Sequence, residues 1–247
     1  MYRWISIWFL FSIGFNEACF SQQVDSIGER PQKKERIFMK RLALPATLFG
    51  LGILGTTDNA IINHDAVRRE RNEHFLHFSN KTDNILQFVP IPVVYVMDAI
   101  GLKAQHDWQQ QSVLLLKSEL IMVAMSVPLK ELTHIRRPDS TDFKSFPSGH
   151  TAQAFTAATF FYKEYGKRYP WLSAGMFAIA GTVGTFRVLN NRHWISDVIA
   201  GSGIGILSVE LAYLLGEKKR TGKEGRQAMV FPSYQNGVVG FRAFVGL

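Results

Sequence analysis

Six long apolar segments are the feature that most limits what this chain can fold into. All six are rich in Leu, Ala, Ile, Val or Phe, and none alternates apolar with polar residues. Such runs favour helices over half-buried strands. We therefore predict an all-α fold, a six-helix bundle that crosses a membrane. The segments span residues 42–62, 84–102, 112–129, 151–162, 171–189 and 195–216.

Charged residues within these segments need partners. Asp98 lies in the second segment, and Lys117 and Glu119 lie in the third. A charged side chain inside a membrane-spanning helix is expected to face the bundle interior or to pair. Lys117 and Glu119 are two residues apart, so they do not face each other along a helix. Each of them is therefore expected to pair elsewhere.

Prolines and glycines in the segments predict local packing. Pro90 and Pro92 are expected to kink the second segment. Gly201 and Gly205 lie four residues apart in the last segment, a spacing that lets a neighbouring helix approach closely. We expect both features to serve packing.

The overall composition leaves both soluble and membrane proteins open. A length of 247 residues favours one domain, and 47% of the residues are hydrophobic while 19% are charged. The net charge of +8 favours an anionic partner, such as a phospholipid surface or a phosphorylated substrate. Nucleic acid is not expected as a partner, because the basic residues lie between apolar segments and not along one stripe.

Residues 1–21 resemble a signal peptide. Arg3 precedes a short apolar run, residues 4–15, and small residues follow at a spacing suited to cleavage after Ser21. Cleavage would remove Cys19, the single cysteine of the chain, and would exclude disulfides from the mature protein. Residues 22–41 are expected to form a basic linker or a helix on the surface, and residues 42–216 the helical core.

Residues 217–247 form a basic tail with a possible β-hairpin. Two strand-like runs, residues 229–234 and 238–245, flank Asn236 and Gly237. Asn-Gly between apolar runs favours a tight hairpin turn. An isolated hairpin is marginally stable, so we expect it to dock on the bundle or on the bilayer.

Residues 187–197 place a histidine and an aspartate where they can interact. His193 and Asp197 are four residues apart, so a helix brings them onto one face. The carboxylate can then fix the imidazole tautomer and leave the second nitrogen as a nucleophile or base. Arg187 precedes them and offers a planar guanidinium to phosphate oxygens. A purely structural His–Asp pair is the alternative that this spacing leaves open.

Residues 147–150, Pro-Ser-Gly-His, precede the fourth segment. Ser148 is a good N-cap, Gly149 lets backbone approach a ligand, and His150 lies in the first helical turn. Free N–H groups at a helix start attract an anion, and His150 would then lie where it can donate a proton. The plainer interpretation is a capped helix with an incidental histidine.

Residues 130–138 add cations at the end of the third segment. Lys130 and Arg137 are seven residues apart, so a continuous helix would stack them on one side before Pro138 ends it. They are either phosphate ligands or ordinary basic residues near a membrane surface. His134 and Arg136 lie beside them and offer contacts to a second phosphate.

Taken together, the patterns K-x6-R-P, P-S-G-H and R-x5-H-x3-D resemble those of the type-2 phosphatidic acid phosphatase and vanadium haloperoxidase superfamily, over about residues 42–216. The resemblance implies that His193 attacks phosphorus and forms a phosphohistidine, that Asp197 orients it, and that His150 protonates the leaving oxygen. It implies no metal and no other cofactor. The implied ligands of the phosphate oxygens are Lys130, Arg137, Ser148, Gly149 and Arg187.

One position departs from the family pattern. The family usually has Ser before the third-motif arginine, and this chain has Phe186. The hydroxyl contact is then lost, or is made by Thr185 or by backbone, with more effect on affinity than on activity. Outside the motifs, His74 and His77 are three residues apart, but no carboxylate or third ligand completes an obvious metal site.

The three motifs fall at one end of the predicted bundle, and the termini fall at the other. More lysine and arginine residues lie at the end with the termini, so the positive-inside rule places the motifs outside a bacterial inner membrane, facing the periplasm. A cleaved signal peptide contradicts this topology. Either it is not cleaved in the usual way, or one segment does not span, or the bundle is soluble.

The resemblance implies a phosphatase acting on a lipid phosphate: a polyprenyl pyrophosphate, a phosphatidate-type lipid or a lipid A phosphate. One alternative is a soluble periplasmic non-specific acid phosphatase, which the signal-like residues and the charges in the apolar segments favour. A vanadium haloperoxidase and a non-catalytic phospholipid-binding protein are further alternatives. The sequence fixes no oligomeric state.

Overall fold

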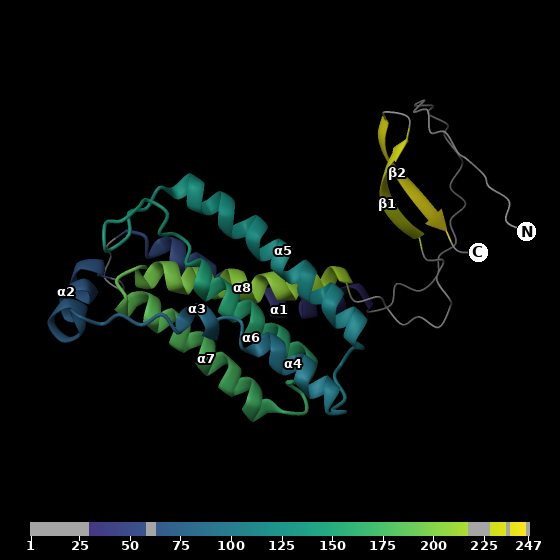
Figure 1. Ribbon diagram of the computed structural model, residues 1–247, viewed down its shortest axis with the longest axis horizontal. Coiled ribbons are helices and arrows are strands. Elements are labelled where there is room, and N and C mark those ends of the chain that lie inside the picture. The colour runs from purple at the N-terminus through teal and green to yellow at the C-terminus, as the bar shows by residue number, and fades with distance from the viewer. Residues whose placement is uncertain (1–29, 58–62, 217–227, 236–237, 246–247) are drawn as a thin grey trace, which may run out of the picture.

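Eight helices and two strands make up the part of the chain that the structure describes. The structure is a computed structural model, and it describes residues 30–57, 63–216, 228–235 and 238–245. The signal-like residues 1–21 lie outside these ranges. The helices are α1 (Arg30–Leu54), α2 (His64–Phe75), α3 (Asp83–Leu86), α4 (Pro90–Ala99), α5 (Trp108–Thr133), α6 (Gly149–Tyr165), α7 (Pro170–Leu189) and α8 (Ile195–Gly216), and the strands are β1 (Ala228–Gln235) and β2 (Val238–Val245) (Figure 1).

The predicted count of six helices is not confirmed, because the described residues contain eight. The second apolar segment is divided: α3 ends at Leu86, and α4 begins at Pro90. Proline is tolerated in the first helical turn, where its missing N–H has no helical partner. Pro90 therefore starts a helix and does not kink one. α2 lies between the first two predicted segments, and Asn63 caps it by accepting the N–H of Ala66 at 2.8 Å.

Within the described ranges, three helices, α5, α7 and α8, are long and apolar enough to cross a membrane, judged by length and composition. α8 is largely buried inside the bundle, whereas only a minority of the residues in the apolar stretches of α5 and α7 are buried. The exposed apolar residues of α5 recur every three or four positions and so form one stripe along the helix. This stripe consists of Val113, Leu116, Leu120, Val123 and Val127.

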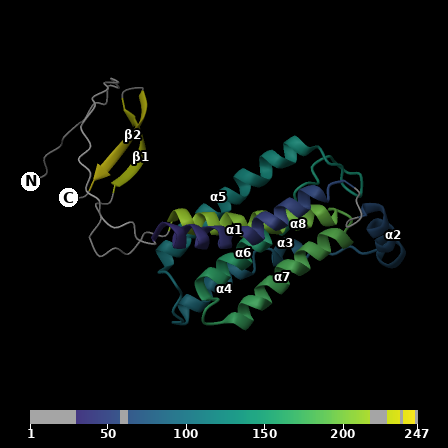
Figure 2. The ribbon, with the colours of Figure 1, turned by 180° about the vertical axis from the view of Figure 1, so that it is seen from behind.

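α8 is the central helix, and its glycines let two neighbours approach closely. It contacts α1, α5, α6 and α7, and Figure 2 shows α1 lying along it. A Cβ at Gly205 would come within 2.4 Å of the Ala152 carbonyl oxygen in α6. A Cβ at Gly203 would come within 2.6 Å of the Phe49 backbone nitrogen in α1. The close packing predicted for Gly205 is therefore confirmed, and α8 is held between two helix backbones.

Acidic residues inside the helices find polar partners, as expected. Gln153 in α6 donates a hydrogen bond to Glu119 Oε1 in α5 at 2.7 Å. The hydroxyl of Tyr165 in α6 donates to Asp98 Oδ1 in α4 at 2.5 Å. Both bonds offset the desolvation of a carboxylate, and both connect α6 to a neighbouring helix.

The tail carries a two-stranded antiparallel sheet. β1 and β2 pair in register from Ala228 with Val245 to Gln235 with Val238. These ranges coincide with the two runs from which the sequence predicts a hairpin, and the turn residues 236–237 lie outside the described ranges. The expected docking of this tail stays a prediction.

Gly205→Ala is expected to lower the free energy of unfolding by about 1–3 kcal/mol, because the added methyl overlaps the Ala152 carbonyl and pushes α8 away from α6. Thermal unfolding of the detergent-solubilised protein, followed by circular dichroism, measures the change. Gly181→Ala in α7 is the matched control, since a Cβ there meets nothing within 4 Å. It is expected to be neutral or to stabilise by about 0.4–1 kcal/mol. Equal melting temperatures for the two variants would contradict the close contact of α6 and α8.

Candidate active site

A polar cleft opens at the end of the bundle where the three sequence motifs meet. Its volume is about 620 Å³, which is typical of ligand pockets. The segment from Phe78 through α3 forms one wall, and the loop from Arg137 to Asp142 forms another. His150 at the start of α6 and Arg187 near the end of α7 also line it. The predicted convergence of the motifs at one end is therefore confirmed.

His193 and Asp197 make the contact that the sequence predicts. His193 Nδ1 lies 3.3 Å from Asp197 Oδ2, and Asp197 is completely buried. Because a carboxylate oxygen accepts, Nδ1 carries the proton and Nε2 keeps a lone pair. His193 itself precedes α8, which begins at Ile195. The pair therefore joins a turn to the first turn of a helix, and not two positions of one helix.

Burial keeps the His193 imidazole neutral. Removal from water lowers the pKa of His193 to about 4, although the hydrogen bond and charge of Asp197 act in the opposite direction. At pH 7 the ring is uncharged, so the Nε2 lone pair is available to an electrophile.

Asp197 also holds the backbone around His193. Its Oδ2 accepts the backbone N–H of Trp194 at 2.9 Å and the hydroxyl of Ser145, which is fully buried. Its backbone carbonyl accepts the N–H of Ser148 at 3.0 Å. One residue of α8 thus connects the histidine to the turn that precedes α6.

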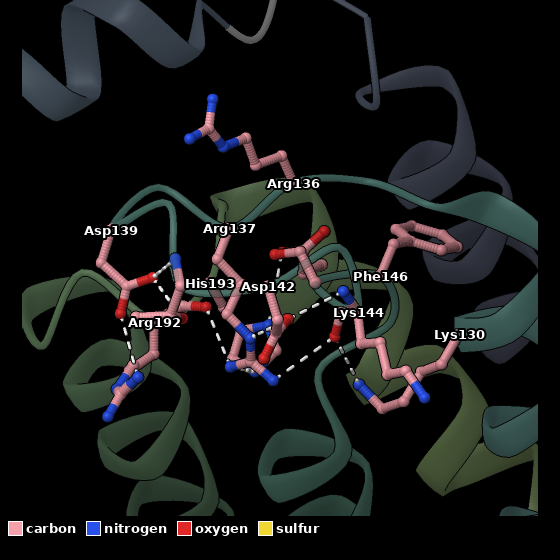
Figure 3. A network of polar contacts seen from close by, with 12 residues as sticks. Lys130, Arg136, Arg137, Asp139, Asp142, Lys144, Phe146, Arg192 and His193 are labelled. Carbon is pink, nitrogen blue, oxygen red and sulfur yellow. Dashed lines mark hydrogen bonds and ion pairs between the residues drawn. The ribbon is translucent and has the colours of Figure 1, made fainter.

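Arg137 lies beside His193 in the polar network of Figure 3. Its Nη1 is 3.4 Å from His193 Nε2, and its Nε donates to Asp142 Oδ1 at 2.7 Å. Arg137 lines the cleft, whereas only 3% of His193 is exposed. An anion entering the cleft therefore meets the guanidinium before it meets the imidazole.

The expected stacking of Lys130 and Arg137 on one helix is wrong. α5 ends at Thr133, and His134 follows with a φ of 47°, in the left-handed region that stops a helix. Arg137 therefore comes from the loop after α5. Pro138 follows the helix end and does not cause it.

Lys130 supports the turn before α6. Its Nζ donates to the carbonyl oxygens of Pro147 at 2.5 Å and Lys144 at 3.3 Å. Ser148 is the N-cap of α6, as predicted, but its hydroxyl pairs with Thr151 Oγ1 at 2.9 Å and makes no capping bond to the helix N–H groups. Both predicted ligands thus shape the turn that would face a phosphate.

Gly149 lies beside Lys130 in this turn, whereas Arg136 lies outside it. A Cβ at Gly149 would lie 3.7 Å from Lys130 Cε, which is ordinary van der Waals contact. The Arg136 side chain points away from the polar network in Figure 3 and lies 5.9 Å from the ring centre of Phe143. Arg136 is therefore turned away from the position where a second phosphate was expected.

His150 lines the cleft and faces α3. Its Nε2 lies 2.8 Å from Asn84 Oδ1, and an amide oxygen accepts, so Nε2 carries the hydrogen in this arrangement. Burial, together with the positive charge of Arg187, lowers the pKa of His150 to about 4. The second histidine of the site is therefore neutral at pH 7.

Arg187 forms an ion pair with α3. Its Nη1 lies 2.8 Å from Asp83 Oδ2, and only 1% of Asp83 is exposed. The Nε of the same guanidinium is buried and has no hydrogen-bond partner among the described residues. An unpaired buried donor is unfavourable, and an anion oxygen would satisfy it.

Phe186, which departs from the family pattern, packs on the cleft wall. Its ring centre lies 5.5 Å from that of Phe78. The Thr185 hydroxyl donates to the Gly181 carbonyl of its own helix at 3.0 Å, so it does not replace the missing serine. Phe186 instead holds the segment before α3 against α7.

Sequence reasoning missed four polar residues of the site. Asp83 and Asn84 stand at the start of an apolar segment, where polar residues are ordinary, and no spacing relates them to the motifs. Ser145 and Asp142 lie in the loop before the Pro-Ser-Gly-His motif, where their short distance from Arg137 and Ser148 was the available signal.

The sequence showed no carboxylate that completes an obvious metal site with His74 and His77, whereas the structure brings two carboxylates near His74. Glu70, Glu73 and His74 on α2 place ligand atoms within 4.8 Å of one another. All three side chains are exposed, and His74 Nδ1 lies 3.4 Å from Glu70 Oε1. Clusters of exposed acidic groups are common without an ion, and this one lacks the buried ligands of the usual metal centre.

Residues 94–221 match the sequence profile of the PAP2 superfamily. The lipid A 1-phosphatase of Porphyromonas gingivalis is 40% identical over 141 residues, which are 57% of this chain and 32% of that protein. The match thus spans about a third of this curated relative.

Among solved structures, Aquifex aeolicus LpxE is 20% identical with a TM-score of 0.48, over 64% of this chain and 97% of that one. A PAP2 type phosphatidylglycerolphosphate phosphatase from Bacillus subtilis is 22% identical with a TM-score of 0.53, over 73% and 99%, which supports the helical fold.

The His193 ring is expected to stay neutral, with Nε2 unprotonated, down to about pH 4, because burial opposes its protonation. Nitrogen-15 NMR of histidine-labelled protein measures this titration, and His193→Gln identifies the signal. Asp197→Asn is expected to lower the pKa of His193 further, since Asp197 favours the charged ring. His77→Gln, at an exposed histidine, removes a different signal and serves as the control. A His193 ring that titrates near the ordinary value of about 6.5 would contradict this environment.

Proposed function

The chain belongs to the PAP2 superfamily, and from that premise we propose that it is a metal-independent phosphatase that hydrolyses a lipid phosphate through a phosphohistidine intermediate. The observation that carries the proposal is the neutral, buried His193, which Asp197 orients behind a cleft lined by Arg137 and Arg187. A nucleophile and an anion cradle are the two parts that phosphoryl transfer requires.

In the first step the lone pair of His193 Nε2 attacks phosphorus. An N–P bond forms while the bond between phosphorus and the leaving oxygen breaks. Asp197 holds Nδ1–H and stabilises the positive charge that develops on the ring. Arg137 contacts Nε2 at 3.4 Å, so the guanidinium exchanges this contact for phosphate oxygens as the substrate arrives.

His150 supplies the proton for the leaving oxygen. Without substrate its pKa is lowered to about 4 by burial and by the charge of Arg187. A phosphate dianion beside His150 and Arg187 adds negative charge, which raises the pKa of His150, so the ring takes up a proton as substrate binds. In the second step His150 accepts a proton from water, the water oxygen attacks phosphorus, and the N–P bond breaks to release orthophosphate.

Lys130, Ser148 and Gly149 complete the proposed cradle. They form the turn at the start of α6, where the helix presents free N–H groups to an anion. Lys130 is held against this turn by the Pro147 carbonyl. The proposed contacts to phosphate would add to these bonds or replace them.

The apolar faces of α5 and α7 support a lipid substrate and an inner-membrane location. The α5 stripe and Trp171 on α7, which is 89% exposed, would be unfavourable in water and favourable in lipid. The relative from Porphyromonas gingivalis is named a lipid A 1-phosphatase, so a lipid A phosphate is the leading substrate, ahead of polyprenyl pyrophosphate and phosphatidate-type lipids. The surplus of basic residues near the termini supports an active site that faces the periplasm.

His193→Ala is expected to reduce phosphate release by at least about 10³-fold, because the nucleophile is lost. Orthophosphate is measured after incubation with lipid A, phosphatidate, polyprenyl pyrophosphate and a soluble aryl phosphate. His77→Ala, a change at an exposed histidine outside the cleft, is expected to keep the wild-type rate. Release by wild type from none of these compounds, or equal release by His193→Ala, would refute the proposal.

The same panel separates the lipid phosphatase from the soluble acid phosphatase. Protein that stays with membranes through a carbonate wash and prefers lipid phosphates fits the proposal. Protein that is released by the wash and prefers the aryl phosphate fits the soluble alternative.

A further inference from the structure

We propose that α3 is a positioning element for the reaction, in which Asp83 fixes the guanidinium of Arg187 and Asn84 fixes the imidazole of His150. The inference rests on the proposed function, because it assigns partners to the phosphate ligand and the proton donor of that reaction. α3 lies before residues 94–221, the range that matches the PAP2 profile. Its contribution is therefore additional to the three motifs.

Two adjacent residues of α3 reach two different helices. Asp83 Oδ2 lies 2.8 Å from Arg187 Nη1 of α7, and Asn84 Oδ1 lies 2.8 Å from His150 Nε2 of α6. α3 packs against both of these helices. The single turn of α3 thereby sets the position of Arg187 relative to His150.

The segment before α3 is itself fastened to the end of α7. The backbone N–H of Asn80 donates to Asn190 Oδ1 at 3.0 Å, and Asn190 Nδ2 donates back to the Asn80 carbonyl at 2.7 Å. Phe78 packs on Phe186. These contacts hold the backbone of α3 in place, so the positions from which its side chains extend are fixed.

Asp83 turns Arg187 so that one edge of the guanidinium is kept for substrate. The carboxylate is 1% exposed and engages Nη1, which leaves Nε as a buried donor without a partner among the described residues. A guanidinium binds phosphate best through two parallel donors of fixed orientation. An arginine without Asp83 would lose that orientation.

Asn84 and Asp197 hold the two histidines with acceptors of different charge. The anionic Asp197 stabilises the positive charge that His193 gains as it attacks. The neutral Asn84 directs His150 Nε2–H without adding a negative charge that would keep the proton on the ring. The structure thus pairs each ring with an acceptor suited to its step.

Asn84→Ala and Asn84→Asp test the second half of this inference. The charged groups that act on His150 are Arg187, Asp83, His193 and Lys130, and Asn84→Asp adds a carboxylate to them. Asn84→Ala is expected to lower kcat for lipid A by about tenfold with little change in KM, because the proton donor loses its orientation. Asn84→Asp is expected to raise the pKa of His150, measured by nitrogen-15 NMR, and to move the pH profile of kcat upward with it.

Asp83→Asn tests the first half. The loss of the contact that orients the guanidinium is expected to weaken orthophosphate binding to the full chain by about tenfold, measured by calorimetry. Asp83→Glu, which keeps the charge, is expected to recover part of the affinity. Ile85→Ala on the same helix, at a side chain that is 72% exposed, is the control and is expected to behave as wild type. Thermal unfolding checks each variant, and the exposed Asn84 decides the inference if Asp83→Asn does not fold.

The outcomes separate this inference from the proposed function. Wild type that releases phosphate while Asn84→Ala and Asp83→Asn match Ile85→Ala would overturn the role of α3 and leave the phosphatase intact. Wild type that releases no phosphate would overturn the phosphatase, and the NMR and binding measurements would still decide α3. In that case, an unchanged His150 titration in Asn84→Asp together with unchanged orthophosphate binding in Asp83→Asn would overturn the positioning role of α3.

Discussion

The buried carboxylate of Asp197 is the interaction on which the geometry of the site depends. His193, Trp194 and Ser145 all donate to the same oxygen, Oδ2, while Oδ1 has no partner among the described residues. A buried carboxylate is unfavourable unless it is hydrogen-bonded, so these donors and the acid stabilise one another. The backbone carbonyl of Asp197 accepts the N–H of Ser148 and so also holds the start of α6. The position of the nucleophile and the position of the N-cap are consequently set by one residue.

Spacing identified the pair whose members are close in the chain, and resemblance to a family pattern identified the other site residues, but neither identified the distant partners in α3. His193 and Asp197 are four positions apart, and their contact forms although only Asp197 is helical. Asp83 and Arg187 are 104 positions apart, and Asn84 and His150 are 66 apart. Long separations leave no periodic pattern, so this half of the site could not be predicted from one sequence.

The helical class of the fold was predictable from the sequence, whereas the number and the boundaries of the helices were less so. Apolar runs without alternation predicted helices correctly, because both faces of the central helix are buried and only composition matters there. The helix count was not predictable, since α2 is a polar helix and α3 has four residues. Pro90 is compatible with a kink and with a helix start, and tertiary packing decides between them. The end of α5 at His134 was missed because a left-handed histidine carries no strong signal.

The end of the helical bundle and its sides present surfaces of different polarity. The cleft is lined mainly by polar and charged residues, whereas the outer faces of α5 and α7 are apolar. A compound with a charged head and a long apolar part matches both surfaces at once.

The glycine packing of α8 also reaches into the site. A Cβ at Gly201 would lie 2.6 Å from the carbonyl oxygen of Ser148 and 3.2 Å from Thr151 Cβ. The close approach of α6 and α8 at Gly201 therefore brings the helix start that carries His150 near the helix start that carries Asp197. Any larger side chain at residue 201 would separate these two helix starts, so this packing position acts on the geometry of the site.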